Sequence, residues 1–170
     1  MLKFLVISDT HGRTDRLRRV LSRHKDADGI LCLGDGLGEV EEAVLLGGYP
    51  TLFSVRGNCD PAVSPYGCLR DEELTVTLGG HRILLLHGHT VSVKSGLGGA
   101  IALARRREAS ILLFGHTHIP LATYLPEEEG GPLWILNPGS LGHPADGSPS
   151  YGLLTLDGRS GVLLSHGKEE

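Results

Sequence analysis

The chain has 170 residues, of which 40% are hydrophobic, so a single domain can bury roughly two thirds of its unfolded surface. Its net charge of −4 excludes a broad positive field that would hold a nucleic-acid backbone, and we expect no stable nucleic-acid binding. Three cysteines without a CxxC pair and a short apolar N-terminal run argue against a disulfide framework and a membrane span, which favours a cytoplasmic protein. Glutamine is absent and methionine occurs once, a scarcity of thermolabile side chains typical of thermophile proteins.

The N-terminal part of the chain alternates strands and helices. Residues 2–8, 29–33 and 51–55 are continuous apolar runs of the kind found in buried parallel strands. Residues 14–25 and 39–46 between them have apolar side chains at helical spacing. This βαβαβ order predicts a parallel sheet.

After residue 60 the pattern predicts antiparallel pairing as well. Residues 74–78 and 82–87 flank Gly79-Gly80, a two-residue hairpin signal. Residues 97–107 are expected to be helical and residues 110–114 to form a buried strand. Two further hairpins are predicted, with strands 121–125 and 133–136 around residues 127–131, and strands 152–156 and 162–166 around residues 157–161.

Together these elements predict an α/β protein with one domain over residues 1–170. Mixed strands with about four helices favour a four-layer α/β/β/α sandwich, in which two mixed sheets face each other and helices flank them. No shift in composition marks a linker or a repeat.

Polar residues directly follow five of the predicted strands. The motifs are Ser8-Asp9-Thr10-His11-Gly12, Gly34-Asp35, Gly57-Asn58-Cys59-Asp60, His87-Gly88-His89 and Gly115-His116-Thr117-His118. Ligands bind at the carboxyl ends of strands in open α/β sheets, so we expect residues distant in sequence to meet there.

The chemical types in these motifs favour a metal site. Carboxylate, imidazole and amide oxygen suit Mn, Fe, Zn, Ni or Co, and no cluster of thiolates competes. Asp9 and His11 are expected to point to the same side of an extended segment, as are His116 and His118. A single histidine at a strand end is usually structural, but five of the nine histidines lie in these motifs.

In order and type, these motifs resemble the signature of the calcineurin-like metallophosphoesterases. The family pattern D-x-H, GD, GN-[HC]-[DE], H and GH-x-H stands here as DTH, GD, GNCD, H and GHTH over residues 9–118. The NPGS segment at residues 137–140 resembles the loop that closes the site in small members. Length and motif order are most similar to the YfcE-type phosphodiesterase branch, which implies the metallo-dependent phosphatase fold.

The resemblance implies two divalent ions, with Mn²⁺ preferred and Fe, Zn, Ni or Co as alternatives. One ion would be held by Asp9, His11 and His118. The other would be held by Asn58, His87 and His116, with Asp35 bridging the two. A hydroxide between the ions would then attack the phosphorus of a small-molecule phosphodiester in line. No GxSxG elbow or Walker A loop offers a rival chemistry.

Cys59 stands where many family members carry a histidine that protonates the leaving oxygen. A thiol with an ordinary pKa near 8.5 is mostly protonated at neutral pH but donates weak hydrogen bonds. We therefore expect a phosphodiesterase, or an esterase of activated phosphates, that is slow on alkyl monoesters. The alternative is that Cys59 is only a small residue in a tight loop.

Five further residues lie in or near the motifs without the place of a ligand. His89 is expected to line the substrate side of the site, and Asp60 to orient a neighbouring ligand. Arg13 and Arg56 can either meet a phosphate or cover the sheet edge. Trp134 is either a packing residue or part of the rim of the site.

A second class of function is a non-catalytic scaffold, because the retromer subunit of eukaryotes resembles the same small branch. Such scaffolds tend to lose a metal-binding histidine, whereas every expected ligand is present here. A metal-binding regulator without turnover is a third reading. No membrane partner is expected, and a homo-oligomer is compatible with the sequence.

Overall fold

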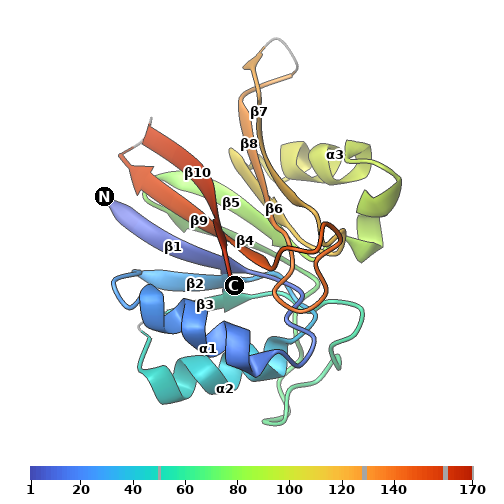
Figure 1. Cartoon of the computed structure of the whole chain (residues 1–170). Helices are drawn as coiled ribbons and strands as arrows, with labels where there is room; N and C mark the ends of the chain where they lie inside the picture. The colour runs from blue at the N-terminus through green and yellow to red at the C-terminus, as the bar shows by residue number, and fades with distance from the viewer. Residues whose placement is uncertain (50, 128–129, 159–160, 170) are drawn as a thin grey trace.

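Two five-stranded sheets face each other in the computed structural model, which describes residues 1–49, 51–127, 130–158 and 161–169 (Figure 1). The first sheet has the spatial order β10 (Gly161–Lys168), β9 (Ser150–Asp157), β1 (Leu2–Ile7), β2 (Gly29–Cys32) and β3 (Leu52–Ser54). The second has the order β4 (Glu73–Leu78), β5 (His81–Leu86), β6 (Ile111–Phe114), β8 (Leu133–Pro138) and β7 (Pro120–Leu125).

Three α-helices cover the outer faces of the two sheets (Figure 1). Helices α1 (Thr14–Arg23) and α2 (Leu37–Gly47) pack on the first sheet through an apolar cluster that includes Leu17 and Val40. Helix α3 (Gly98–Arg106) packs on the second sheet, preceded by two short 3-10 helices, η1 (His89–Val91) and η2 (Val93–Ser95).

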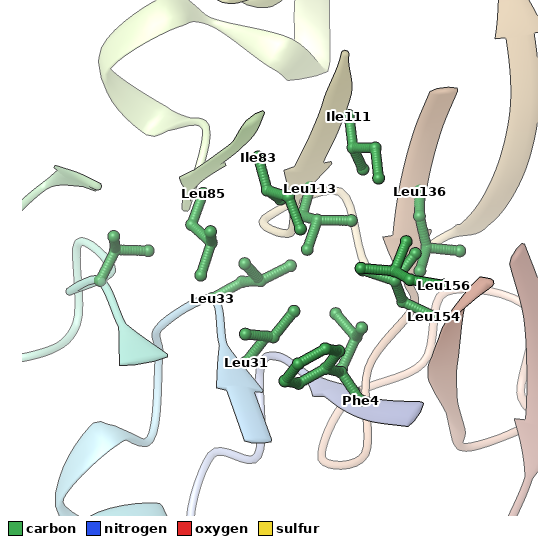
Figure 2. Close-up of a cluster of buried hydrophobic side chains, with 12 residues drawn as sticks. Phe4, Leu31, Leu33, Ile83, Leu85, Ile111, Leu113, Leu136, Leu154 and Leu156 are labelled. Carbon is green, nitrogen blue, oxygen red and sulfur yellow. The ribbon is translucent and has the colours of Figure 1, made fainter. Parts of the chain in front are cut away.

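The main core lies between the sheets, where side chains of both inner faces interdigitate (Figure 2). Leu31 and Leu33 from the first sheet meet Leu85 and Leu113 from the second, and all four are fully buried. The helices form the two outer layers, and each of these layers buries the outer apolar face of one sheet. The predicted four-layer α/β sandwich of two mixed sheets is confirmed.

Most predicted elements occur within a few residues of their expected bounds. Strands β1, β2 and β3 are parallel, and β4 pairs with β5 through Gly79 and Gly80, whose φ angles of +57° and +85° suit the mirror-image turn of a hairpin. The described part has three α-helices rather than about four. Strands β7 and β8, like β9 and β10, pair in antiparallel fashion, but residues 128–129 and 159–160 of their predicted turns lie outside the described residues.

The topology brings six strand ends to one edge of the sandwich. Strands β1, β2 and β3 of the first sheet run parallel, as do β5, β6 and β8 of the second. Main-chain hydrogen bonds join the loops that follow them, from Asp9 N to Gly34 O (2.9 Å) and from Gly115 N to His87 O (3.0 Å). All the predicted motifs therefore lie at this edge. None of the helices in the described ranges is long and apolar enough to cross a membrane.

Candidate metal centre

The loops that carry the predicted ligands adopt an unusual backbone conformation. Asp9, His11, Asp35, His116 and His118 all have positive φ angles, between 43° and 67°. Left-handed backbone costs non-glycine residues about 1–3 kcal/mol each and occurs where the surroundings hold it for function. The expectation that Asp9 and His11, or His116 and His118, share one side of an extended segment is therefore wrong. Tight left-handed turns aim these side chains inward instead.

Asp9, His11 and His118 form the first cluster. Their ligand atoms all lie within 4.8 Å of one another. Asp9 Oδ1 lies 3.0 Å from His118 Nε2 and 3.6 Å from His11 Nε2, and the two imidazole nitrogens are 3.4 Å apart. One carboxylate oxygen and two imidazole nitrogens thus converge on one point, as a transition-metal ion requires.

Asp9 Oδ1 is the strongest sign that an ion belongs there. Asp9 is fully buried, and its Oδ2 accepts hydrogen bonds from Ser8 Oγ (2.5 Å) and His116 N (3.1 Å). Its Oδ1 is buried and has no hydrogen-bond partner among the described residues. A buried acceptor without a partner costs free energy unless a ligand satisfies it, so this oxygen fits a metal ion.

Asp35, His87 and His116 form the second cluster, and their ligand atoms also lie within 4.8 Å of one another. His87 Nε2 is 3.4 Å from Asp35 Oδ2 and 3.1 Å from His116 Nδ1. Asp35 Oδ2 is also 3.9 Å from His11 Nε2 of the first cluster. Asp35 therefore lies between the clusters, where the sequence predicted a bridging residue.

Backbone carbonyls fix the orientation of two imidazoles. His87 Nδ1 donates to Leu33 O at 2.7 Å, and His118 Nδ1 donates to His143 O at 2.7 Å. Because a carbonyl only accepts, these bonds place the proton on Nδ1 and leave Nε2 free to bind an ion.

The loop after β3 lies beside both clusters. Cys59 N donates to Asp35 Oδ1 at 2.8 Å, so this loop holds the Asp35 carboxylate in place. The Cys59 side chain is exposed, and its Sγ lies within 4.8 Å of ligand atoms of His11 and Asp35. Asn58 is also exposed, and its Nδ2 is 3.3 Å from Cys59 Sγ, an arrangement that uses the amide nitrogen and not the oxygen expected to bind an ion.

Asp60 holds the backbone around Asp35. Its Oδ2 accepts from Asp35 N (2.7 Å) and Gly57 N (2.8 Å), and its Oδ1 accepts from Gly36 N and Leu37 N (both 2.9 Å). One buried carboxylate thus ties the loop after β2 to the loop after β3. This geometry agrees with the expected orienting role of Asp60.

The NPGS segment at residues 137–140 forms hydrogen bonds with two of the motif loops. Asn137 is fully buried and donates to Gly115 O and Thr117 Oγ1, both at 3.0 Å. Ser140 Oγ donates to Asp9 O and accepts from His143 N, both at 2.8 Å. The segment therefore positions the two loops that carry the first cluster.

The remaining predicted residues separate into two groups. His89 lies beside the second cluster, with its ring centroid 5.5 Å from that of His87. Arg56 bonds to Glu72, whose Oε1 is 3.9 Å from His89 Nε2, so both lie near the site. Arg13 pairs instead with Asp15 at the surface, at 3.2 Å.

Trp134 packs on an aromatic neighbour rather than on the metal centre. Its ring centroid is 4.5 Å from that of Tyr124, and it pairs with Ile111 at the start of β6. The site lies at the other end of β6, so the rim role is not supported.

His143 is a site residue that the motifs did not indicate. Its exposed ring stacks on His11 with centroids 4.7 Å apart and an interplanar angle of 12°. Its carbonyl orients His118. The only sequence signal was its position three residues after Ser140, in the loop that follows β8.

The protonation of these groups reflects their mutual contacts. Burial raises the pKa of Asp35, but the contact with His87 and the hydrogen bond from Cys59 N outweigh it and hold the pKa at about 2. The contact with the Asp9 carboxylate raises the pKa of His118, while burial and the charge of His87 lower that of His116 to about 4. The pKa of His87 is raised because the carboxylates of Asp35 and Asp9 outweigh its burial.

The sequence matches the calcineurin-like phosphoesterase superfamily domain over residues 2–159, and the chain belongs to that superfamily. It is 34% identical to the probable metallophosphoesterase YsnB of Bacillus subtilis, over 92% of this chain and 85% of that protein. It is 32% identical to the phosphodiesterase YfcE of Escherichia coli, over 97% and 94% of the two chains.

The fold is also that of Vacuolar Protein Sorting 29 from Cryptosporidium parvum. Their structures superpose with a TM-score of 0.73 over 98% of this chain and 97% of the other, at 22% sequence identity. This likeness concerns the fold alone.

Replacing Asp60 by asparagine is expected to weaken the loop scaffold. An amide would direct N–H groups at backbone donors, which should lower the free energy of unfolding by about 2–3 kcal/mol and metal affinity by about 10–100-fold. Urea denaturation and calorimetric metal titration measure the two effects. Asp26→Asn, an exposed carboxylate paired with Lys3, is the control and should change unfolding by less than about 0.5 kcal/mol. Unchanged metal affinity in folded Asp60→Asn would contradict the orienting role.

Metal affinity is expected to fall as the pH is lowered. His87 and His118 have raised pKa values, so protons compete for these ligands at higher pH than for an ordinary histidine. Below the pKa of the relevant imidazole, each ion should lose about tenfold in affinity per pH unit. Calorimetric titration with Mn²⁺ at pH 8 and pH 6 measures the difference, and equal affinities would refute this account.

Proposed function

We propose that this protein is a metal-dependent phosphodiesterase with a dinuclear centre. The observation that carries the proposal is the pair of clusters with Asp35 between them and the unpartnered Asp9 Oδ1. Membership of the phosphoesterase superfamily and the name of the E. coli relative support the same reaction class.

In this proposal Asp9, His11 and His118 hold one ion. His87 and His116 hold the other with Asn58, and Asp35 bridges the two. When bound, two such ions polarise the phosphoryl oxygens and lower the pKa of a water molecule toward neutrality. Mn²⁺ is the first ion to test, and the donor set also suits Fe, Zn, Ni and Co. Three free cysteines agree with a cytoplasmic setting.

The chain's own residues orient the ligands and contact the substrate. Leu33 O and His143 O fix the imidazoles of His87 and His118. The side chain of His89 is 21% exposed and lies beside the second cluster, and in this proposal it contacts the substrate. In this proposal the proton donor is the exposed thiol of Cys59, which lies close to Asp35. Partial desolvation and the Asp35 carboxylate raise the pKa of this thiol.

Hydrolysis of bis-p-nitrophenyl phosphate with added Mn²⁺ is expected, and chelation should abolish it. Asp35→Asn and His87→Ala should each lower kcat/KM by more than about 100-fold, beyond the loss expected of a residue that only orients a ligand. His24→Ala is a control, because His24 contacts Tyr151 behind helix α1 and not the centre. A metal-loaded wild type without activity on diesters or monoesters would favour the alternative of a non-catalytic scaffold.

Cys59→His is expected to raise turnover of esters with poor leaving groups, by about 100-fold or more, because imidazolium is the better acid. Esters of p-nitrophenol need little protonation and should change little. Leaving-group dependence of kcat across a series of alkyl and aryl diesters measures this, with Cys68→His as the matched control at another exposed cysteine. If Cys59→Ala equals wild type and Cys59→His shows no dependence on leaving-group pKa, Cys59 is only a small loop residue.

A further inference from the structure

A cavity of about 440 Å³ opens beside the candidate metal centre. His11, Asp35 and Cys59 form its wall on the side of the centre, and Glu39, Glu42 and Asp60 lie around the rest. Because His11 and Asp35 belong to the two clusters, the cavity adjoins both of them. Its described lining contains three acidic residues besides Asp35 and no lysine or arginine.

Two of the acidic side chains are already engaged by the protein. Asp60 accepts from four backbone N–H groups, as described above. Glu39 accepts from Gly12 N at 2.9 Å and from Thr10 Oγ1. These bonds hold both carboxylates in place at the cavity wall.

The N-terminus of helix α2 also lies at this wall, and a helix N-terminus favours anions. Here the N–H groups of Gly36 and Leu37 already donate to Asp60 Oδ1, both at 2.9 Å. The protein's own carboxylate therefore occupies the position that a second anionic group of a substrate would need.

Glu42 differs from the other acidic residues of the cavity. Glu42 is exposed on α2. Its side chain forms no hydrogen bond or ion pair with any residue that the structure describes. Its carboxylate is free to meet a group of the substrate. Among the described residues that line the cavity there is no Phe, Tyr or Trp, the side chains whose faces bind quaternary ammonium groups.

We propose that this cavity binds the ester arm of a phosphodiester and selects an arm that ends in a primary ammonium group. The inference rests on the proposed phosphodiesterase function. The phosphate would lie at the ions, and the ammonium would donate hydrogen bonds to Glu42, as its three N–H groups allow. Arms that end in a carboxylate or a second phosphate would place another negative charge beside Glu42 and are disfavoured.

Three p-nitrophenyl diesters test this selectivity, because they share one leaving group and differ only in the second arm. The arms are 2-aminoethyl, 2-hydroxyethyl and carboxymethyl. For the Mn²⁺-loaded wild type, kcat/KM should fall in that order, with about two- to fivefold between successive members, the range expected of one exposed charge pair. Calorimetric binding of the matched methylphosphonate esters, which cannot release p-nitrophenolate, should follow the same order.

Variants of Glu42 assign the effect to this cavity. Glu42→Gln should remove most of the preference for the ammonium over the hydroxyl arm, and Glu42→Lys should bring the carboxylate arm above the ammonium arm. Glu108→Gln is the matched control, because Glu108 is exposed before β6 at the end of that strand away from the centre. It should leave the wild-type order unchanged.

The possible failures are distinguishable. Hydrolysis of all three diesters with equal kcat/KM, or an ammonium preference that survives both Glu42 variants, would overturn the selectivity while leaving the phosphodiesterase intact. If the metal-loaded wild type hydrolyses none of the three, the phosphodiesterase proposal fails and the selectivity fails with it.

Discussion

Two carboxylates, Asp9 and Asp35, are buried at the edge where the sheets meet, and the surrounding residues of the site stabilise their negative charge. An ionised carboxylate away from water requires hydrogen bonds or positive charge. Asp9 receives two hydrogen bonds on Oδ2, whereas its Oδ1 faces imidazole nitrogens. A cation that binds this free oxygen among the histidines would offset the cost of burying the carboxylate, so the site favours cation binding. These contacts hold the motif loops in their strained, left-handed backbone conformation.

The main architecture and the location of the site could be predicted from the sequence. Apolar runs of four to six residues identified β1, β2 and β6, and the polar residues directly after them identified the edge where ligands gather. The location could be predicted because the carboxyl ends of parallel strands lie at the same edge of a sheet, whatever the details of side-chain packing. The number of ligand-type residues at these positions separated a metal site from isolated structural histidines.

Other features depend on three-dimensional detail that local pattern does not contain. The left-handed turns at His116 and His118 follow from contacts with Asn137 and His143, which lie about 20 or more residues further along the chain. The sequence predicted an orienting role for Asp60, but not the four backbone donors through which it holds the loops. His143 was missed because stacking of its ring on His11 has no signature in the sequence. Trp134 could not be assigned because an aromatic residue suits both a packing role and a place at the rim of the site.

The order in which the chain is synthesised has a consequence for the site. Strand β1 carries the first ligands, yet its antiparallel partner β9 ends at Asp157, and the Ser140 hydroxyl that fixes Asp9 O is 131 residues downstream. The motif at Asp9 and His11 therefore emerges first from the ribosome but reaches its final geometry only after β8 and β9 have been made. Until then, the loops that carry the ligands lack the contacts that fix them, so the proposed metal centre would reach its final geometry only in the last stage of folding.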